Sequence, residues 1–158
     1  MSKPRGDRQV PPGVREISRD SLNDLVTLLA SEGLPIEDVA EPERRFFAFF
    51  NADGATVGYG GLERADGGML LRSVVTTPKE RRAGYGRMLT QWLIAEAERS
   101  GAGDLYLLTT TARDFFAKLG FEVVERTSVP PAIAISREFS SLCPSTAITM
   151  KRRLRAEP

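Results

Sequence analysis

The sequence has no histidine and a single cysteine, Cys143. Without histidine, the commonest general base near neutral pH and most zinc sites are excluded. One cysteine cannot form an internal disulfide, which fits a reducing compartment. No apolar run approaches the roughly 18 residues of a membrane span, and the N-terminal stretch MSKPRGDRQVPPG lacks the apolar core of a signal peptide. We therefore expect a cytoplasmic protein without a metal site, active as a monomer or homodimer.

Strong charge imbalance is also missing. The 158 residues carry a net charge of +1, with 41% hydrophobic and 27% charged residues. This composition is typical of a globular chain of one domain. Near-neutral charge argues against a nucleic-acid surface, although the cationic tail with Lys151, Arg152, Arg153 and Arg155 keeps that alternative open. We expect a disordered N-terminal lead over residues 1–13 and a single domain over residues 14–155.

The periodicity of apolar residues predicts an α/β domain. Helical spacing is found at residues 21–32, after Gly86, and at residues 112–119. Extended, β-branched or aromatic segments are found at residues 14–17, 45–50, 55–63, 69–75, 104–108, 121–125 and 147–151. Tight turns join the second, third and fourth of these as an antiparallel meander. The order predicts three layers, a mixed central sheet of about six or seven strands with flanking helices.

Residues 73–99 are the stretch around which the chain is organised. A strand is followed by a short basic loop with glycines, and then by a helix. The first N–H groups of a helix lack partners and, with the helix dipole, bind anions such as phosphate. Glycine lets the backbone approach a bulky ligand. The cations are Lys79, Arg81, Arg82 and Arg87, and the glycines are Gly84 and Gly86. A solvated basic turn that caps an ordinary helix is the alternative interpretation.

Two motifs resemble those of the GNAT N-acetyltransferases. RRAGYG at residues 81–86 is similar to that family's acyl-CoA pyrophosphate loop, and VVTTP at residues 74–78 is similar to its central strand. ARDFFAKLGF at residues 112–121 resembles the family's second motif. The resemblance implies the GNAT fold and acetyl-CoA as co-substrate. It assigns CoA binding to Val74, Val75, Thr76, Arg81, Arg82, Ala83, Gly84, Tyr85, Gly86, Arg87 and Lys118.

Acetyl transfer from a thioester to an amine requires a deprotonated amine and a polarised carbonyl. With no histidine, the base must be a carboxylate or water, and Glu63 at the end of a predicted strand is the first candidate. Pairing of Glu63 with Arg72 on the neighbouring strand is the alternative. Arg72 stands in an apolar strand and needs a partner, which is Glu63 or a substrate carboxylate. The resemblance implies that this strand splays from its neighbour, so that Ser73 and the residues after it offer backbone groups for catalysis.

The chain departs from the family at Phe116, where many members have a tyrosine that protonates the CoA thiolate, and at Thr109, where many have asparagine. Phe115 and Phe121 are expected in the core. The segment containing Glu37, Asp38 and Glu41 is expected to be a solvated acidic loop, although in the family this segment often covers the acceptor.

Two stretches point to relatives within the family. LLTTTARDFF at residues 107–116 looks like the acetyltransferase module of N-acetylglutamate synthases. REFSSLCPST at residues 137–146 is similar to a tail of GNAT proteins linked to arsenic resistance. Both imply a small amino-acid-like acceptor, with Arg72, Arg137 and Thr109 as candidates for binding it. An acyl-CoA-binding module without turnover and a protein-lysine acetyltransferase are the alternative functions.

Overall fold

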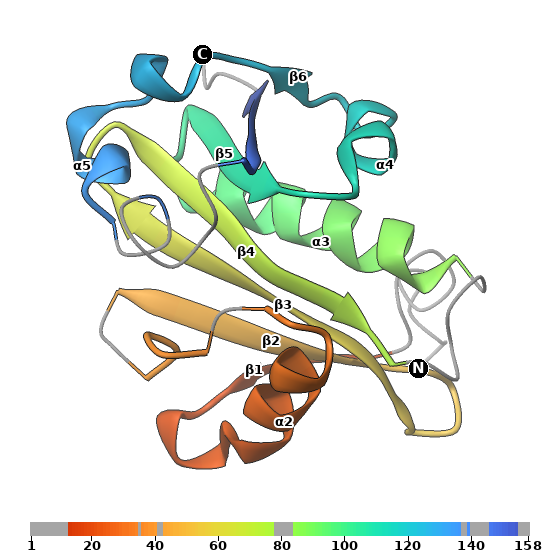
Figure 1. Cartoon of the computed structure of the whole chain (residues 1–158). Helices are drawn as coiled ribbons and strands as arrows, with labels where there is room; N and C mark the ends of the chain where they lie inside the picture. The colour runs from red at the N-terminus through yellow and green to blue at the C-terminus, as the bar shows by residue number, and fades with distance from the viewer. Residues whose placement is uncertain are drawn as a thin grey trace.

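A seven-stranded mixed sheet runs through the molecule, with the strand order β1-β2-β3-β4-β5-β7-β6 (Figure 1). The structure is a computed structural model and describes residues 13–34, 36–40, 43–77, 84–136, 139 and 146–154. The strands are β1 (Gly13–Ile17), β2 (Arg44–Phe50), β3 (Thr56–Ala65), β4 (Gly68–Thr76), β5 (Asp104–Thr109), β6 (Glu122–Val123) and β7 (Ile148–Arg153). The helices are α2 (Asn23–Ser31), α3 (Tyr85–Arg99), α4 (Arg113–Ala117) and α5 (Pro131–Ala134), with 3-10 turns η1 (Arg19–Ser21) and η3 (Arg126–Ser128).

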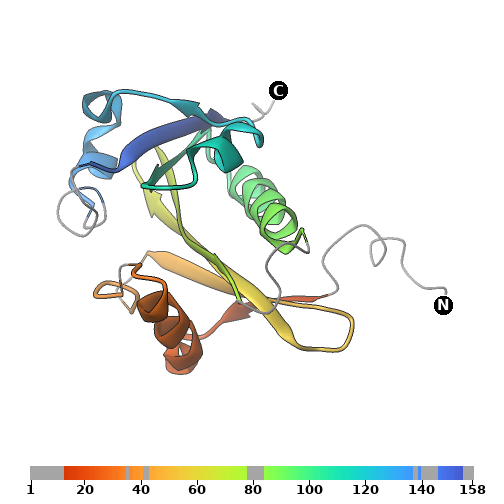
Figure 2. The ribbon, with the colours of Figure 1, turned by 45° about the vertical axis from the view of Figure 1, so that its right-hand side comes forward.

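Helices cover both faces of the sheet, and α2 and α3 lie on opposite sides of it (Figure 2). Alternation along β2 explains this arrangement, because successive side chains of a strand point to opposite faces. Phe47 and Phe49 pack in the cluster that contains α3 residues, whereas Phe46 and Ala48 pack in the cluster that contains α2 residues. Each fully buried phenylalanine side chain stabilises the fold by about 1.5–3 kcal/mol.

The glycines of β3 bring α3 close to the sheet. A β-carbon at Gly58 would lie 2.7 Å from a methyl of Leu89, and one at Gly60 would clash with a methyl of Leu93. The sequence predicts that something packs tightly against this strand, and that prediction is confirmed. Helix α3 is therefore held directly over β3 and β4, which fixes where its N-terminus lies.

A bulge interrupts β4 at Ser73. Gly61 faces Arg72 and Tyr59 faces Val75. One residue of β3, Gly60, therefore lies opposite two residues of β4, Ser73 and Val74. Ser73 has φ of 58°, in the left-handed region that non-glycine residues seldom adopt. The extra residue inverts the side-chain alternation. Leu71 and Val74 pack in the α3 cluster, although they lie an odd number of positions apart.

Strands β4 and β5 pair over a short stretch only. Their parallel register joins Met69 to Leu105 and Leu70 to Tyr106. Beyond these pairs β4 continues to Thr76, beside β3, while β5 continues to Thr109, beside β7. The two strands therefore form the arms of a V that opens toward the N-terminus of α3.

The predicted fold class is confirmed, with differences at the ends of elements. The strand predicted at residues 121–125 is shortened to β6, and the helix predicted at residues 112–119 is shortened to α4. The predicted N-terminal lead lies almost entirely outside the described residues. Within the described ranges, no helix is long and apolar enough to cross a membrane.

Candidate functional site

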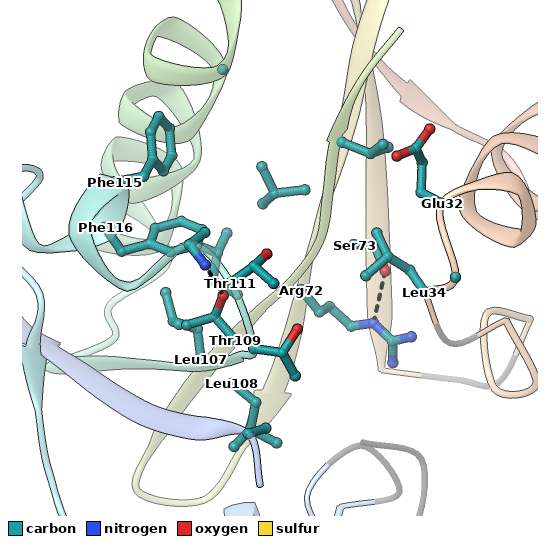
Figure 3. Close-up of a pocket in the computed structure, with 18 of the residues that line it drawn as sticks. Glu32, Leu34, Arg72, Ser73, Leu107, Leu108, Thr109, Thr111, Phe115 and Phe116 are labelled. Atoms are coloured by element: carbon teal, nitrogen blue, oxygen red, sulfur yellow. Dashed lines mark hydrogen bonds between the residues drawn. The ribbon is translucent and has the colours of Figure 1, made fainter. Parts of the chain in front are cut away.

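A cleft of about 830 Å³ lies between the diverging arms of the V formed by β4 and β5. One wall is formed by β4 and by the chain that leaves α2, and the other by the end of β5 and by α4 (Figure 3). Its lining residues include Glu32, Leu34, Ile36 and Glu37 on the α2 side, Leu71 to Thr76 on β4, Gly86 on α3, and Leu107 to Ala112, Phe115 and Phe116 opposite. A cleft of this size and mixed polarity is typical of a small-molecule site.

The N-terminus of α3 lies at the open end of the cleft. Gly84 caps the helix with φ of 84°, a conformation that glycine adopts without cost. The first helical hydrogen bond runs from the Met88 N–H to the Gly84 carbonyl, so the N–H groups of residues 85–87 lack acceptors within the helix. A 15-residue helix presents a partial positive charge at this end. The arrangement suits a phosphate group.

Apart from Gly84, which caps α3 and does not line the cleft, the predicted CoA-binding residues fall into three groups. Val74, Val75, Thr76 and Gly86 line the cleft. Tyr85 packs against the core, and the side chains of Arg87 and Lys118 are exposed and do not line the cleft. Arg81, Arg82 and Ala83 lie outside the described residues. The role of each in binding stays a prediction.

Beneath the β4 wall lies a buried cluster of four charged side chains, Asp38, Arg44, Glu63 and Arg72. Arg72 donates two hydrogen bonds to the Asp38 carboxylate, from Nη1 to Oδ2 at 2.6 Å and from Nη2 to Oδ1 at 2.7 Å. It lies 3.4 Å from Glu63 Oε1. Arg44 approaches both carboxylates, at 3.1 Å from Asp38 and 3.2 Å from Glu63. Within the part of the chain that the structure describes, two cations thus face two anions, and this pairing offsets the cost of withdrawing the charges from water.

The two carboxylates of the cluster respond differently to burial. Burial alone would raise the pKa of Asp38, but its hydrogen bonds with Arg72, and then the charges of Arg72 and Arg44, hold it below the usual value. Burial raises the pKa of Glu63, and the neighbouring arginines offset this only in part. Asp38 is therefore the fixed anion of the cluster, and Glu63 accepts a proton more readily.

Asp38 is the residue that sequence reasoning missed. The prediction that its segment is a solvated acidic loop is wrong for Asp38, whose side chain has no exposed surface. The side chain is buried because it forms ion pairs with Arg72 and Arg44 beneath the sheet. Glu37 is exposed and lines the cleft, while Glu41 lies outside the described residues. The pairing of Glu63 with Arg72 is present, but Asp38 is the bidentate partner. An arginine inside an apolar strand was the available signal that a buried carboxylate had to exist.

Glu63 and Arg72 sit differently with respect to the cleft. Arg72 lines it, with its guanidinium side chain fully buried against Asp38, whereas Glu63 is not among the lining residues. A base at Glu63 would therefore act through water. The predicted roles of Glu63 as base and of Arg72 in holding a substrate carboxylate stay predictions.

The opposite wall carries the residues at which the sequence departs from the motif that it resembles. Thr109 Oγ1 accepts a hydrogen bond from the Ala112 N–H at 3.0 Å, which shapes the turn into α4. Phe116 is buried against Phe121, and both belong to the core. Phe115 is 37% exposed and lines the cleft, so the prediction that it is a core residue is wrong. Its ring lies over the start of α3, near Gly86. Arg137 lies outside the described residues.

Among the described residues, no group of acidic, cysteine or histidine side chains is arranged to hold a metal ion.

Comparisons with known proteins agree with this geometry. The family model of the acetyltransferase (GNAT) domain matches residues 42–123, more than half of the chain. No curated protein sequence matches the chain. Rv2747 from Mycobacterium tuberculosis, solved in complex with CoA, has a TM-score of 0.73 at 19% identity, over 91% of this chain and 100% of that one.

Two further solved structures are similar. N-acetylglutamate synthase from Neisseria gonorrhoeae, complexed with CoA and L-arginine, has a TM-score of 0.72 at 19% identity, over 90% of this chain and 33% of the synthase. An aminoglycoside 6'-N-acetyltransferase complexed with CoA has a TM-score of 0.67 at 20% identity, over 92% of this chain and 99% of that one. At these identities the likeness concerns the fold alone.

Proposed function

Since the chain belongs to the GNAT acetyltransferase family, we propose that it transfers an acetyl group from acetyl-CoA to the amine of a small, amino-acid-like molecule. The observation that carries the proposal is the V-shaped cleft between β4 and β5, which opens at the N-terminus of α3. A nucleotide-bearing thioester needs both an anion site for its pyrophosphate and a narrow slot for the long arm that ends in the acyl group.

In this proposal the pyrophosphate binds the free N–H groups at the start of α3, with the cations of residues 81–87 adding to the positive field. The pantetheine arm lies along β4 past Thr76 and Val74, whose backbone faces the cleft because β5 has diverged. Gly86 leaves room for this passage, since a β-carbon there would approach Phe115 and Thr76 at 3.6 and 3.7 Å. The acyl group then reaches the inner part of the cleft near Ser73.

The acceptor enters from the α2 side, past Leu34, Ile36 and Glu37. Its amine must lose a proton before or during attack, and a free α-amine is mostly protonated near pH 7. Glu63 receives this proton through water in our proposal, because burial raises its pKa toward the range of an effective base. The thiolate leaves without a tyrosine, since Phe116 has no proton to give, and is protonated by solvent.

Two relatives motivate the acceptor class. N-acetylglutamate synthase and the aminoglycoside enzyme are both named for the acetylation of small amines. We extend the proposal to detoxification of amino-acid analogues, including those that contain arsenic, on the basis of the sequence at residues 137–146. A cytoplasmic monomer or homodimer is part of the same proposal.

A thiol-release assay tests this proposal. Purified protein is incubated with acetyl-CoA and a panel of amines, namely the common L-amino acids, an arsenic-containing amino-acid analogue, an aminoglycoside and a lysine-bearing peptide. We expect CoA release above the amine-free rate for at least one small amino-acid-like member. Binding of CoA without release for any amine would instead support the acyl-CoA-binding module, and release with the peptide alone would support a protein-lysine acetyltransferase.

A further inference from the structure

Ser73 occupies a special position in the cleft. It lies just beyond Leu70, the last β4 residue paired with β5, and therefore near the point where the two arms of the V meet. Thr76 marks the opposite, open end, close to Gly86 at the start of α3. A thioester whose phosphates bind at α3 would place its acyl end toward Ser73. The side chain of Ser73 is half-buried and lines the cleft (Figure 3).

The hydrogen bonds of the Ser73 hydroxyl are only partly used. Its oxygen accepts a hydrogen bond from Arg72 Nε–H at 3.1 Å (Figure 3). Among the described residues this is its one side-chain hydrogen bond, so its own proton has no protein acceptor there. A hydroxyl carries one donor and two acceptor sites. With one lone pair directed at Arg72, the proton is directed elsewhere, and the cleft is the space available to it.

Arg72 is suited to fix this orientation. Its side chain is fully buried, and the bidentate contacts with Asp38 leave the guanidinium little freedom to rotate. A guanidinium cannot take up a proton in a protein, so Ser73 is not activated as a nucleophile. A cation that donates to the hydroxyl oxygen instead polarises the O–H bond and makes it a stronger donor. The bulge at Ser73, with its left-handed φ, turns the residue out of the regular strand alternation.

We propose that the Ser73 hydroxyl donates a hydrogen bond to the acyl carbonyl oxygen of the thioester as negative charge develops on it. This inference rests on the proposed function. The amine nitrogen bonds to the carbonyl carbon, and the C=O electron pair moves onto oxygen, where Ser73 stabilises it. The C=O bond then re-forms, the C–S bond breaks, and CoA leaves as the thiolate. The amine proton passes to water or Glu63, and the thiolate takes a proton from solvent. Arg72 is a positioning residue that acts through Ser73.

The test compares Ser73→Ala and Ser73→Gly with wild type, using the panel amine that wild type acetylates fastest. Both variants remove the hydroxyl, but glycine also relieves the left-handed backbone. The matched control is Ser128→Ala, which removes an exposed hydroxyl in η3, outside the cleft. The measurements are kcat and KM for acetyl-CoA, the Kd of CoA by calorimetry, and the rate of acetyl-CoA hydrolysis without amine.

We expect kcat to fall roughly 10²-fold in both Ser73 variants, the usual order of effect for one oxyanion donor. The Kd of CoA should stay within about twofold of wild type, and Ser128→Ala should behave as wild type. Amine-free hydrolysis should fall by a similar factor, because water attack forms the same oxyanion.

Three results would overturn the inference while leaving the proposed function intact. These are a kcat within about twofold of wild type, a loss in Ser73→Ala that Ser73→Gly restores, or slowed transfer with unchanged hydrolysis. The first would show an idle hydroxyl, the second a backbone effect, and the third a contact with the acceptor. Failure of wild type to acetylate any panel amine would refute the proposed function itself, and the inference would fall with it.

Discussion

Asp38→Asn is the change that most directly probes the buried cluster. Asparagine keeps the shape of the side chain but removes the charge that two arginines share. Breaking a buried ion pair at one partner costs about 3–5 kcal/mol, because the other charge stays buried and loses its main counterion. For a chain of this length each kcal/mol lowers Tm by about 2–4 °C, so we expect Tm to fall by roughly 6–20 °C.

Glu63→Gln is the matched comparison, since it makes the same chemical change within the same cluster. Its contacts with the arginines, 3.2 and 3.4 Å, are longer than those of Asp38 with Arg72. Burial raises its pKa, so the folded state already disfavours its charged form. We therefore expect Glu63→Gln to cost clearly less than Asp38→Asn in urea denaturation at neutral pH. An equal or larger cost for Glu63→Gln would refute the assignment of Asp38 as the principal partner of Arg72.

The pH dependence gives a second readout of the same difference. The pKa of Asp38 is lowered in the folded state, so its contribution to stability is complete above its unfolded pKa of about 3.9 and is lost as pH falls through the folded pKa. The raised pKa of Glu63 has the opposite sign, because its penalty at neutral pH is relieved as pH falls through the folded pKa. Asp38→Asn should thus flatten the loss of stability below about pH 4, and an unchanged acid limb would contradict the reasoning.

Two further predictions concern turnover and packing. Glu63→Gln should lower kcat roughly 10²-fold near neutral pH, with a smaller loss at high pH where the amine is already deprotonated, and a wild-type kcat at every pH would leave water as the base. Gly60→Ala should destabilise the fold by about 1–3 kcal/mol, because the new methyl meets Leu93 of α3. Gly103→Ala, in open space, is its control in the same denaturation assay, and equal stability of the two variants would contradict the close packing of α3.

Much of the fold could be predicted from the sequence because its signals are local. The aromatic run in β2, the glycines of β3 and the change to helical spacing after Gly86 can each be read from neighbouring residues. The helix N-terminus at the open end of the cleft could be predicted for the same reason. A strand, a glycine loop and a helix follow one another along the chain, and their order predicts an anion site there.

The buried cluster could not be predicted in the same way, since it depends on tertiary contacts. Asp38 and Arg72 are far apart in sequence, and only the folded chain shows that residues 36–40 cover this part of the sheet. No glycine or proline in the sequence marks the position of the bulge at Ser73. Phe115 and Phe116 are adjacent and chemically identical, and which one is exposed and which is buried depends on the rotation of the short helix α4.

Calorimetric titration with CoA tests the central claim that the cleft between β4 and β5 binds acyl-CoA at the N-terminus of α3. The variants are Gly86→Val, which places two methyl groups beside Phe115 and Thr76 in the cleft, and the control Gly103→Val, whose side chain points into open space. We predict that wild type and Gly103→Val bind CoA equally, and that folded Gly86→Val binds at least about tenfold more weakly, or roughly 1.4 kcal/mol. Equal affinity of all three, or no binding by wild type, would contradict the account.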